Sequence, residues 1–183
     1  MKKYKHFRSI INNKPVSDTM FVYNIINMSQ NIMFKEYDKT IFILIGIQAS
    51  GKTTFCQEYF DDFDIVSLDI MKTRKKEDKA INEIINSGKN IVIDNTNTTI
   101  EERKKYIDIA QQNGYKTVGI YFRSSIDECL KRNSQRRNNV PLKGILATAK
   151  KLEQPSYSEN FDELYYVKID DNKFRTSKWN KEL

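Results

Sequence analysis

Short β-branched apolar runs and longer amphipathic stretches alternate along this chain. Five runs have the length and composition of buried strands, at Thr40–Ile45, Ile65–Leu68, Asn90–Ile93, Thr117–Phe122 and Leu164–Ile169. Helix-compatible stretches lie between them, at Lys52–Phe60, Glu77–Ser87, Ile100–Gln112, Ser125–Arg137 and Leu142–Leu152. Strands separated by helices of this length predict an α/β fold, in which right-handed crossovers build a parallel sheet with helices on both faces.

The two ends of the chain lack this alternation. Residues 1–39 carry scattered aromatic side chains without a clean period, which is compatible with a packed arm or with a partly ordered tail of unknown role. Residues 170–183 are predicted to form a polar C-terminal tail. The 183 residues therefore predict one compact domain over residues 40–169, long enough to bury a single sizeable core.

The charge balance is basic, with 31 Lys and Arg against 24 Asp and Glu and a net charge of +7. This excess favours phosphate-bearing partners. A Lys-, Asn- and Ile-rich composition that reflects the coding genome explains the charge equally well. Cys56 and Cys129 lack metal-ligand spacing and are typical of reduced thiols in the cytoplasm or another reducing intracellular compartment. Apolar runs too short to span a bilayer and the absence of a hydrophobic core after Met1 predict no membrane association.

Residues 46–53, Gly-Ile-Gln-Ala-Ser-Gly-Lys-Thr, match the G-x-x-x-x-G-K-[ST] phosphate-binding loop. Their position between a predicted strand and a predicted helix argues against a chance match on a turn. Glycines let backbone N–H groups surround a phosphate, and the helix N-terminus adds positive potential. Lys52 is expected to reach the β- and γ-phosphates, and Thr53 to offer its hydroxyl to Mg²⁺. The predicted nucleotide-binding residues are Gly46, Ala49, Ser50, Gly51, Lys52, Thr53 and Thr54.

Two further predicted strands end in an aspartate, and the carboxyl ends of parallel strands meet at the edge where ligands bind. Asp94 follows an apolar run in the manner of a Walker B carboxylate that supports Mg²⁺, with a turn or capping role as the alternative. Asp69 is a candidate to orient an acceptor hydroxyl and take its proton, with capping of the next turn as the alternative. A second carboxylate facing the γ-phosphate favours a kinase over a hydrolysing ATPase.

A basic stretch follows the fourth predicted strand. Arg132 and Arg136 are four residues apart, so on one helix they are expected to share a face and to clamp the β- and γ-phosphates. The Val140-Pro141 step then breaks the helix and gives a lid a place to flex. A solvated basic helix face is the alternative interpretation of the same charges.

Several segments together resemble the kinase domain of 5′-hydroxyl polynucleotide kinases. They are Ile93-Asp94-Asn95-Thr96-Asn97, Arg132-Asn133-x-x-Arg136, Val140-Pro141 and Pro155-Ser156-Tyr157-x-x-x-Phe161. The segment from Ser67 to Arg74 is also similar to one found in small stand-alone P-loop kinase-like proteins. The resemblance extends from about Thr40 to Ile169. It implies the P-loop kinase fold, with a five-stranded sheet in the order 2-3-1-4-5.

The resemblance also implies roles for single residues. Asp69 would be the general base on the acceptor 5′-hydroxyl, while Lys52 and Thr53 hold ATP and Mg²⁺. Arg136 would be the lid arginine, with Arg132 assisting. The acceptor and metal sides would be formed by Asp94, Asn95, Thr96 and Asn97, with the acceptor-phosphate arginine mapping to Lys72 or Arg74.

The sequence departs from that family in two respects. Ala49 stands where polynucleotide kinases usually have glycine. Residues 94–98 also lack the D-x-D-G-T signature of a phosphatase, so we do not expect this chain to be a bifunctional end-healing enzyme.

Three functions remain open from the sequence. The first is an ATP-dependent kinase that phosphorylates the 5′-hydroxyl of a nucleic acid, with salt-sensitive activity. The second is a kinase of the same fold that acts on a nucleoside, a sugar or another small hydroxyl compound in a closed pocket. The third is a nucleotide-dependent nucleic-acid-binding protein without transfer activity. The oligomeric state is not indicated by the sequence.

Overall fold

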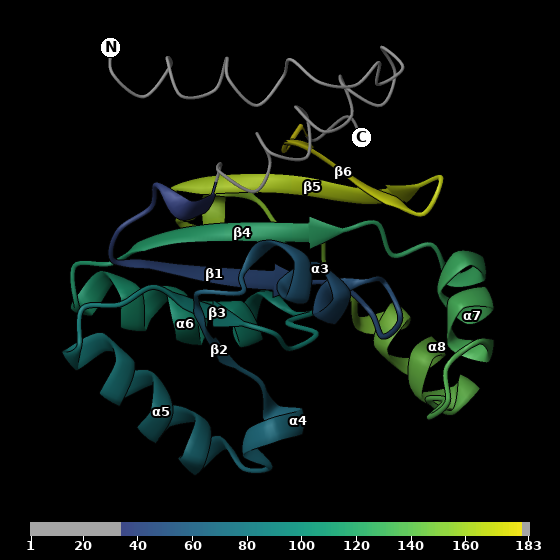
Figure 1. Cartoon of the computed structure of the whole chain (residues 1–183), viewed down its shortest axis with the longest axis horizontal. Helices are drawn as coiled ribbons and strands as arrows, with labels where there is room; N and C mark the ends of the chain where they lie inside the picture. Colours follow the sequence, from purple (N-terminus) through teal and green to yellow (C-terminus); the bar gives the residue numbers. More distant parts are fainter. Residues whose placement is uncertain (1–33, 181–183) are drawn as a thin grey trace, which may run out of the picture. The chain divides into compact units, whose positions relative to one another are not determined.

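The computed structural model describes residues 34–180, and those from Glu36 onward belong to one compact unit (Figure 1). The choice between a packed arm and a tail for residues 1–39 therefore falls largely outside the described residues. The strands are β1 Thr40–Ile45, β2 Asp64–Val66, β3 Ile91–Ile93, β4 Lys116–Phe122, β5 Glu163–Asp170 and β6 Lys173–Lys178. The helices are α3 Lys52–Tyr59, α4 Leu68–Met71, α5 Arg74–Asn86, α6 Ile100–Gln112, α7 Ile126–Ser134, α8 Leu142–Lys151 and a short 3₁₀ helix, Tyr157–Glu159.

The six strands form one sheet in the order β2-β3-β1-β4-β5-β6. The first five are parallel neighbours in the predicted order 2-3-1-4-5, with Ile41 opposite Ile91 on one side of β1 and opposite Thr117 on the other. The prediction of five strands missed a sixth, β6. It lies in the segment expected to be a polar tail and pairs antiparallel with β5.

Helices cover both faces of the sheet, as predicted. The odd positions of β1 pack in one apolar cluster with Ile81 of α5 and with Ile107 and Ala110 of α6. The even positions face the other way, where Phe42 contacts Phe60 beyond the end of α3, with ring centroids 5.0 Å apart. β1 is buried along its whole length because both faces are covered, which is why it is a continuous apolar run in the sequence.

The local sequence explains most helix ends. Thr99 begins α6 with a capping box in which Glu102 returns the hydrogen bond, and Asn113-Gly114 ends it with Gly114 at φ +67°. Ser87 and Gly88 end α5 in the same way, with Gly88 at φ +73°. α5 begins at Arg74, three residues before the predicted start, because the hydroxyl of the N-cap residue Thr73 accepts the N–H of Lys76.

Two predicted boundaries were wrong in ways that affect the site. β2 ends at Val66, and Ser67 then begins the short helix α4, so Asp69 lies in the first turn of a helix and not at a strand end. The helix predicted over Ser125–Arg137 is α7, which ends at Ser134. Its last turn tightens as the N–H groups of Gln135 and Arg136 bond the carbonyls three residues back.

Candidate active site

The P-loop connects β1 to α3 at the carboxyl edge of the sheet, where the arrowheads of β1 and β4 point in Figure 1. Lys52 is almost fully buried, and its ammonium group donates to the carbonyl oxygens of Gly46 at 2.9 Å and Ile47 at 2.8 Å. Burial lowers the pKa of Lys52 to about 8, with a further contribution from the positive charge of Arg136. Burial disfavours the charged form of Lys52, and the negative charge of a bound phosphate would favour it again.

The second glycine of the loop is required by both conformation and space. Gly51 has φ +107°, and a Cβ there would lie 2.9 Å from Cδ1 of Ile169. Ala49 also has a positive φ, +61°, a conformation that favours glycine and is uncommon for alanine. The Ala49 methyl packs in a small apolar cluster with side chains of α7 and α8.

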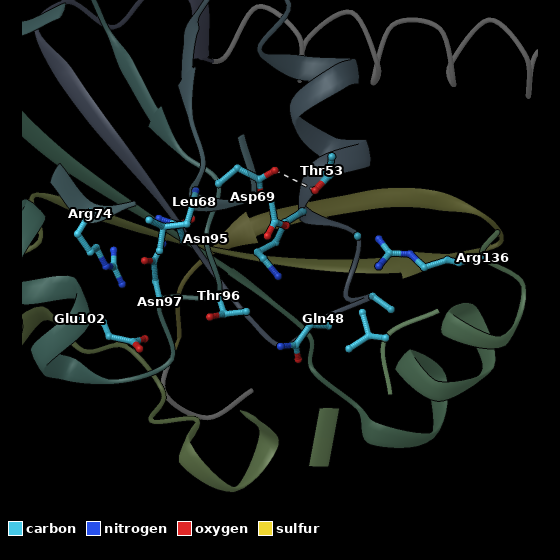
Figure 2. A pocket seen from close by; sticks show the side chains of 15 residues that line it. Gln48, Thr53, Leu68, Asp69, Arg74, Asn95, Thr96, Asn97, Glu102 and Arg136 are labelled. Carbon is cyan, nitrogen blue, oxygen red and sulfur yellow. Dashed lines mark hydrogen bonds between the residues drawn. The ribbon is translucent and has the colours of Figure 1, made fainter. Parts of the chain in front are cut away.

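Thr53 and Asp94 form the pair expected for a divalent cation. The Thr53 hydroxyl donates to the Asp94 carboxylate at 2.8 Å, the dashed line in Figure 2. Burial raises the pKa of Asp94 above its ordinary value, and the negative charge of Asp69 adds to the effect. A bound cation would lower the pKa of Asp94 again. A hydroxyl and a carboxylate are oxygen ligands that Mg²⁺ accepts, so Thr53 and Asp94 fit this ion.

These side chains line a pocket of about 420 Å³. Eleven of the residues predicted from sequence line it, namely Ala49, Gly51, Lys52, Thr53, Asp69, Arg74, Asp94, Asn95, Thr96, Asn97 and Arg136. In Figure 2, Arg74 and Arg136 lie on opposite sides of the pocket, with Asp69 and Thr53 between them. Four lining residues were not predicted, namely Gln48, Leu68, Glu102 and Val140.

The other predicted site residues are not part of the pocket lining. Gly46, Ser50 and Thr54 belong to the loop and the first turn of α3, with Ser50 accepting a long hydrogen bond of 3.4 Å from Lys52. Lys72 is the exposed C-cap of α4. Arg132 lies on α7, and its Nε donates to the Ala49 carbonyl at 2.8 Å. Because α7 ends at Ser134, Arg132 and Arg136 do not share a helix face.

The Asn-Thr-Asn segment after β3 holds the pocket together through hydrogen bonds. Asn97 donates to the carbonyl of Leu44 at 2.7 Å, and the carbonyl of Thr96 accepts the N–H of Gly46 at 2.9 Å. Asn95 accepts the N–H of Leu68 at 2.8 Å, next to Asp69. This segment therefore links the P-loop to the turn that carries Asp69.

A buried carboxylate that the sequence analysis missed supports one side of the pocket. Glu77 of α5 accepts hydrogen bonds from Arg74, Asn95, Lys105 and Tyr106 at 2.8–2.9 Å. Burial alone would raise the pKa of Glu77, but these four donors bring it below its ordinary value. Glu77 lies in the first turn of α5, where a carboxylate is common, so its position in the sequence alone does not indicate this role.

Comparisons with known proteins identify the family of the chain. A family model described as an AAA domain, a P-loop domain, matches residues 41–155. The chain belongs to this family. A bifunctional polynucleotide phosphatase/kinase of Schizosaccharomyces pombe is 30% identical over 154 residues, which are 80% of this chain and 38% of that protein. The chain thus spans about two fifths of the length of this curated relative.

Solved structures share the fold of the chain at low sequence identity. Chaetomium thermophilum Kti12 in complex with ADP-AlF3 has a TM-score of 0.56 and 13% identity, over 72% of this chain and 90% of that one. The AvrRxo1-ORF1:-ORF2 structure with ATP has a TM-score of 0.58 and 14% identity, over 82% of this chain and 60% of that one. The P-loop kinase fold is therefore established. Within the described part of the chain, no helix has the length and apolar character needed to cross a membrane.

Proposed function

We propose that this protein is an ATP-dependent phosphotransferase that moves the γ-phosphate of ATP to the 5′-hydroxyl of a polynucleotide. The observation that carries the proposal is a single pocket in which a P-loop, the exposed carboxylate of Asp69 and two arginines converge. The name of the fission yeast relative, which includes a polynucleotide kinase, supports the acceptor class.

The ATP side of the reaction follows from the P-loop. The ammonium group of Lys52 would exchange its two carbonyl partners for oxygens of the β- and γ-phosphates. Thr53 and Asp94 would hold Mg²⁺, which supplies positive charge to the phosphate oxygens. Arg136, which lines the pocket opposite Arg74, would neutralise charge on the transferring phosphoryl group.

The acceptor side follows from Asp69 and Arg74. The Asp69 carboxylate would take the proton of the 5′-hydroxyl as its oxygen bonds to the γ-phosphorus, and the bond from that phosphorus to the β–γ bridging oxygen breaks to release ADP. Arg74 lines the pocket whereas Lys72 does not, which favours Arg74 as the group that binds a phosphate of the acceptor strand. Its Nη1 is held by Glu77 and Tyr106, and half of its side chain remains exposed.

The test is transfer of labelled γ-phosphate from ATP with Mg²⁺ to a 5′-hydroxyl oligonucleotide, compared with free nucleosides. We expect label on the oligonucleotide, and Asp69→Asn should lower kcat by about 10²-fold or more while ATP binding stays nearly unchanged. Asp108→Asn, an exposed carboxylate on α6, is the matched control. Full activity of Asp69→Asn would refute the assignment of the base.

The acceptor class is tested in the same assay. Label only on nucleosides or sugars would support phosphotransferase activity and refute the polynucleotide as acceptor. Release of free phosphate alone would refute both assignments. For a polynucleotide, Arg74→Ala should raise KM for the oligonucleotide and reduce the salt dependence by about one phosphate contact, and Lys72→Ala should do neither.

A further inference from the structure

Three consecutive P-loop residues are attached to the helix pair α7 and α8. The Ala49 carbonyl accepts the hydrogen bond from Arg132 of α7, and the Gln48 amide donates to the Thr148 hydroxyl of α8 at 3.0 Å. Ile47 and Ala49 pack in one apolar cluster with Cys129 and Ile145. The base of the helix pair is thereby fixed to the loop that would hold the nucleotide phosphates.

The connection between α7 and α8 is closed at its base by one side chain. Asn133, only 7% exposed, donates to the Val140 carbonyl at 2.8 Å and accepts the Val140 N–H at 2.9 Å. Both backbone groups of Val140 are thus paired with one amide, as they would be by a neighbouring strand. The two bonds close a loop of residues 134–139, which contains Arg136, the arginine that lines the pocket.

Resting on the function proposed above, we propose that Asn133 is a positioning residue for Arg136. Closing a loop at its base removes conformational freedom from every residue within it. Arg132 fixes that base to the P-loop, so the Arg136 guanidinium is presented at a defined place relative to the γ-phosphate. The moving part of the lid is then the loop 134–139 alone, and Arg132 acts as a clamp between α7 and the P-loop instead of contacting phosphate.

Coupling between Asn133 and Arg136 separates the positioning role from a general contribution to stability. A residue that only stabilises the fold lowers activity regardless of Arg136, whereas a positioning residue acts through Arg136. In a double-mutant cycle the second case gives strong coupling between the two residues. Misplacing a catalytic group by about 1 Å can cost 10²-fold in rate, which sets the size of effect to look for.

The experiment measures kcat and KM for ATP in Asn133→Ala, Arg136→Ala and the double variant, with Ser134→Ala as control. Ser134 is the exposed neighbour whose hydroxyl donates to the Lys131 carbonyl. We expect Asn133→Ala to lower kcat about tenfold to 10²-fold with KM for ATP changed less than about threefold. In the Arg136→Ala background the same substitution should change kcat less than about twofold. Equal losses of kcat in both backgrounds, or no loss in Asn133→Ala, would overturn the proposal.

Cleavage by trypsin after Arg136 and Arg137 gives a readout that needs no transfer activity. Asn133→Ala should be cut there several-fold faster than the unaltered protein and Ser134→Ala, because opening its base releases the loop. Unchanged cleavage would overturn the proposal. If the unaltered protein phosphorylates no hydroxyl acceptor, the proposed function fails instead, and the cleavage rates still decide whether Asn133 holds the loop.

Discussion

The Asn95 amide is held between a buried carboxylate and the turn that carries Asp69. Its nitrogen donates to Glu77 at 2.8 Å, and its oxygen accepts the backbone N–H of Leu68 at 2.8 Å. Glu77 thus determines which way the amide faces, and the amide determines where the turn lies. The same carboxylate holds Arg74, so one side chain outside the pocket arranges both groups of the acceptor side.

Replacing Glu77 should therefore lower the free energy of unfolding more than breaking an ordinary surface ion pair does. In Glu77→Gln an amide replaces a charge that satisfies four donors, two of them cationic, and the free energy of unfolding should fall by about 3 kcal/mol. Urea denaturation measures the change. Glu83→Gln breaks an exposed pair with Lys79 on the same helix and should change stability by less than about 0.5 kcal/mol. Equal effects of the two substitutions would contradict the role of Glu77.

The depressed pKa of Lys52 predicts proton uptake when ATP binds. Burial lowers this pKa to about 8 from 10.5, so above pH 8 more than half of the folded molecules are neutral at Lys52. Phosphate oxygens favour the charged form, so binding at pH 8.5 should take up protons, and binding at pH 6.5 should take up none at Lys52. Calorimetry in buffers of different ionisation enthalpy measures the uptake. Lys52→Arg, whose guanidinium stays charged, should abolish it, and persistence of the uptake in that variant would assign it elsewhere.

The same shift predicts how the nucleotide-free protein responds to alkali. The folded-state pKa lies below the unfolded value, so between about pH 8 and pH 10.5 the unfolded chain binds more protons at Lys52. The contribution of Lys52 to stability therefore rises with pH over this interval. This contribution should be absent from Lys52→Arg.

The Thr53–Asp94 pair predicts a specific metal defect. Thr53→Val removes the hydroxyl that bonds Asp94 and should raise the Mg²⁺ concentration for half-maximal activity by about tenfold or more. Gln57→Ala is the control because Gln57 is exposed on the same helix, α3, and does not line the pocket. Titration of Mg²⁺ at saturating ATP gives the comparison. If Gln57→Ala shifts the Mg²⁺ requirement as much, the defect belongs to the helix and not to a metal ligand.

Gly119 of β4 is predicted to be intolerant of any side chain. A Cβ there would lie 2.4 Å from Cδ2 of Leu164 and 3.0 Å from Cε1 of Phe161, inside the core. Gly119→Ala should destabilise the protein by about 1–3 kcal/mol. Gly144→Ala on α8 meets only Cγ1 of Val140 at 3.6 Å and should stabilise the protein by up to about 1 kcal/mol. Thermal unfolding of the two variants should therefore move in opposite directions.

The sixth strand, β6, was not predicted because its sequence is almost entirely polar. Apart from the buried Phe174, every residue of β6 is polar, so the strand has only a weak apolar signal. The signal was in the turn, where Asp171 and Asn172 both have positive φ, the conformation of a tight two-residue hairpin. Attention to that pair would have predicted an antiparallel edge strand.

The sequence by itself determined the order of elements, the P-loop and the residues that end most helices. These features depend on neighbours within a few residues, such as the β-branched run of β1 and the capping box of Thr99 and Glu102. Only the tertiary structure decided which polar residues face the pocket and which support it. Glu77 is held by donors from α5, from α6 and from the segment after β3, and Asn133 bonds a residue seven positions away across a loop. Such bonds depend on how separate elements pack, so no local pattern of residues encodes them.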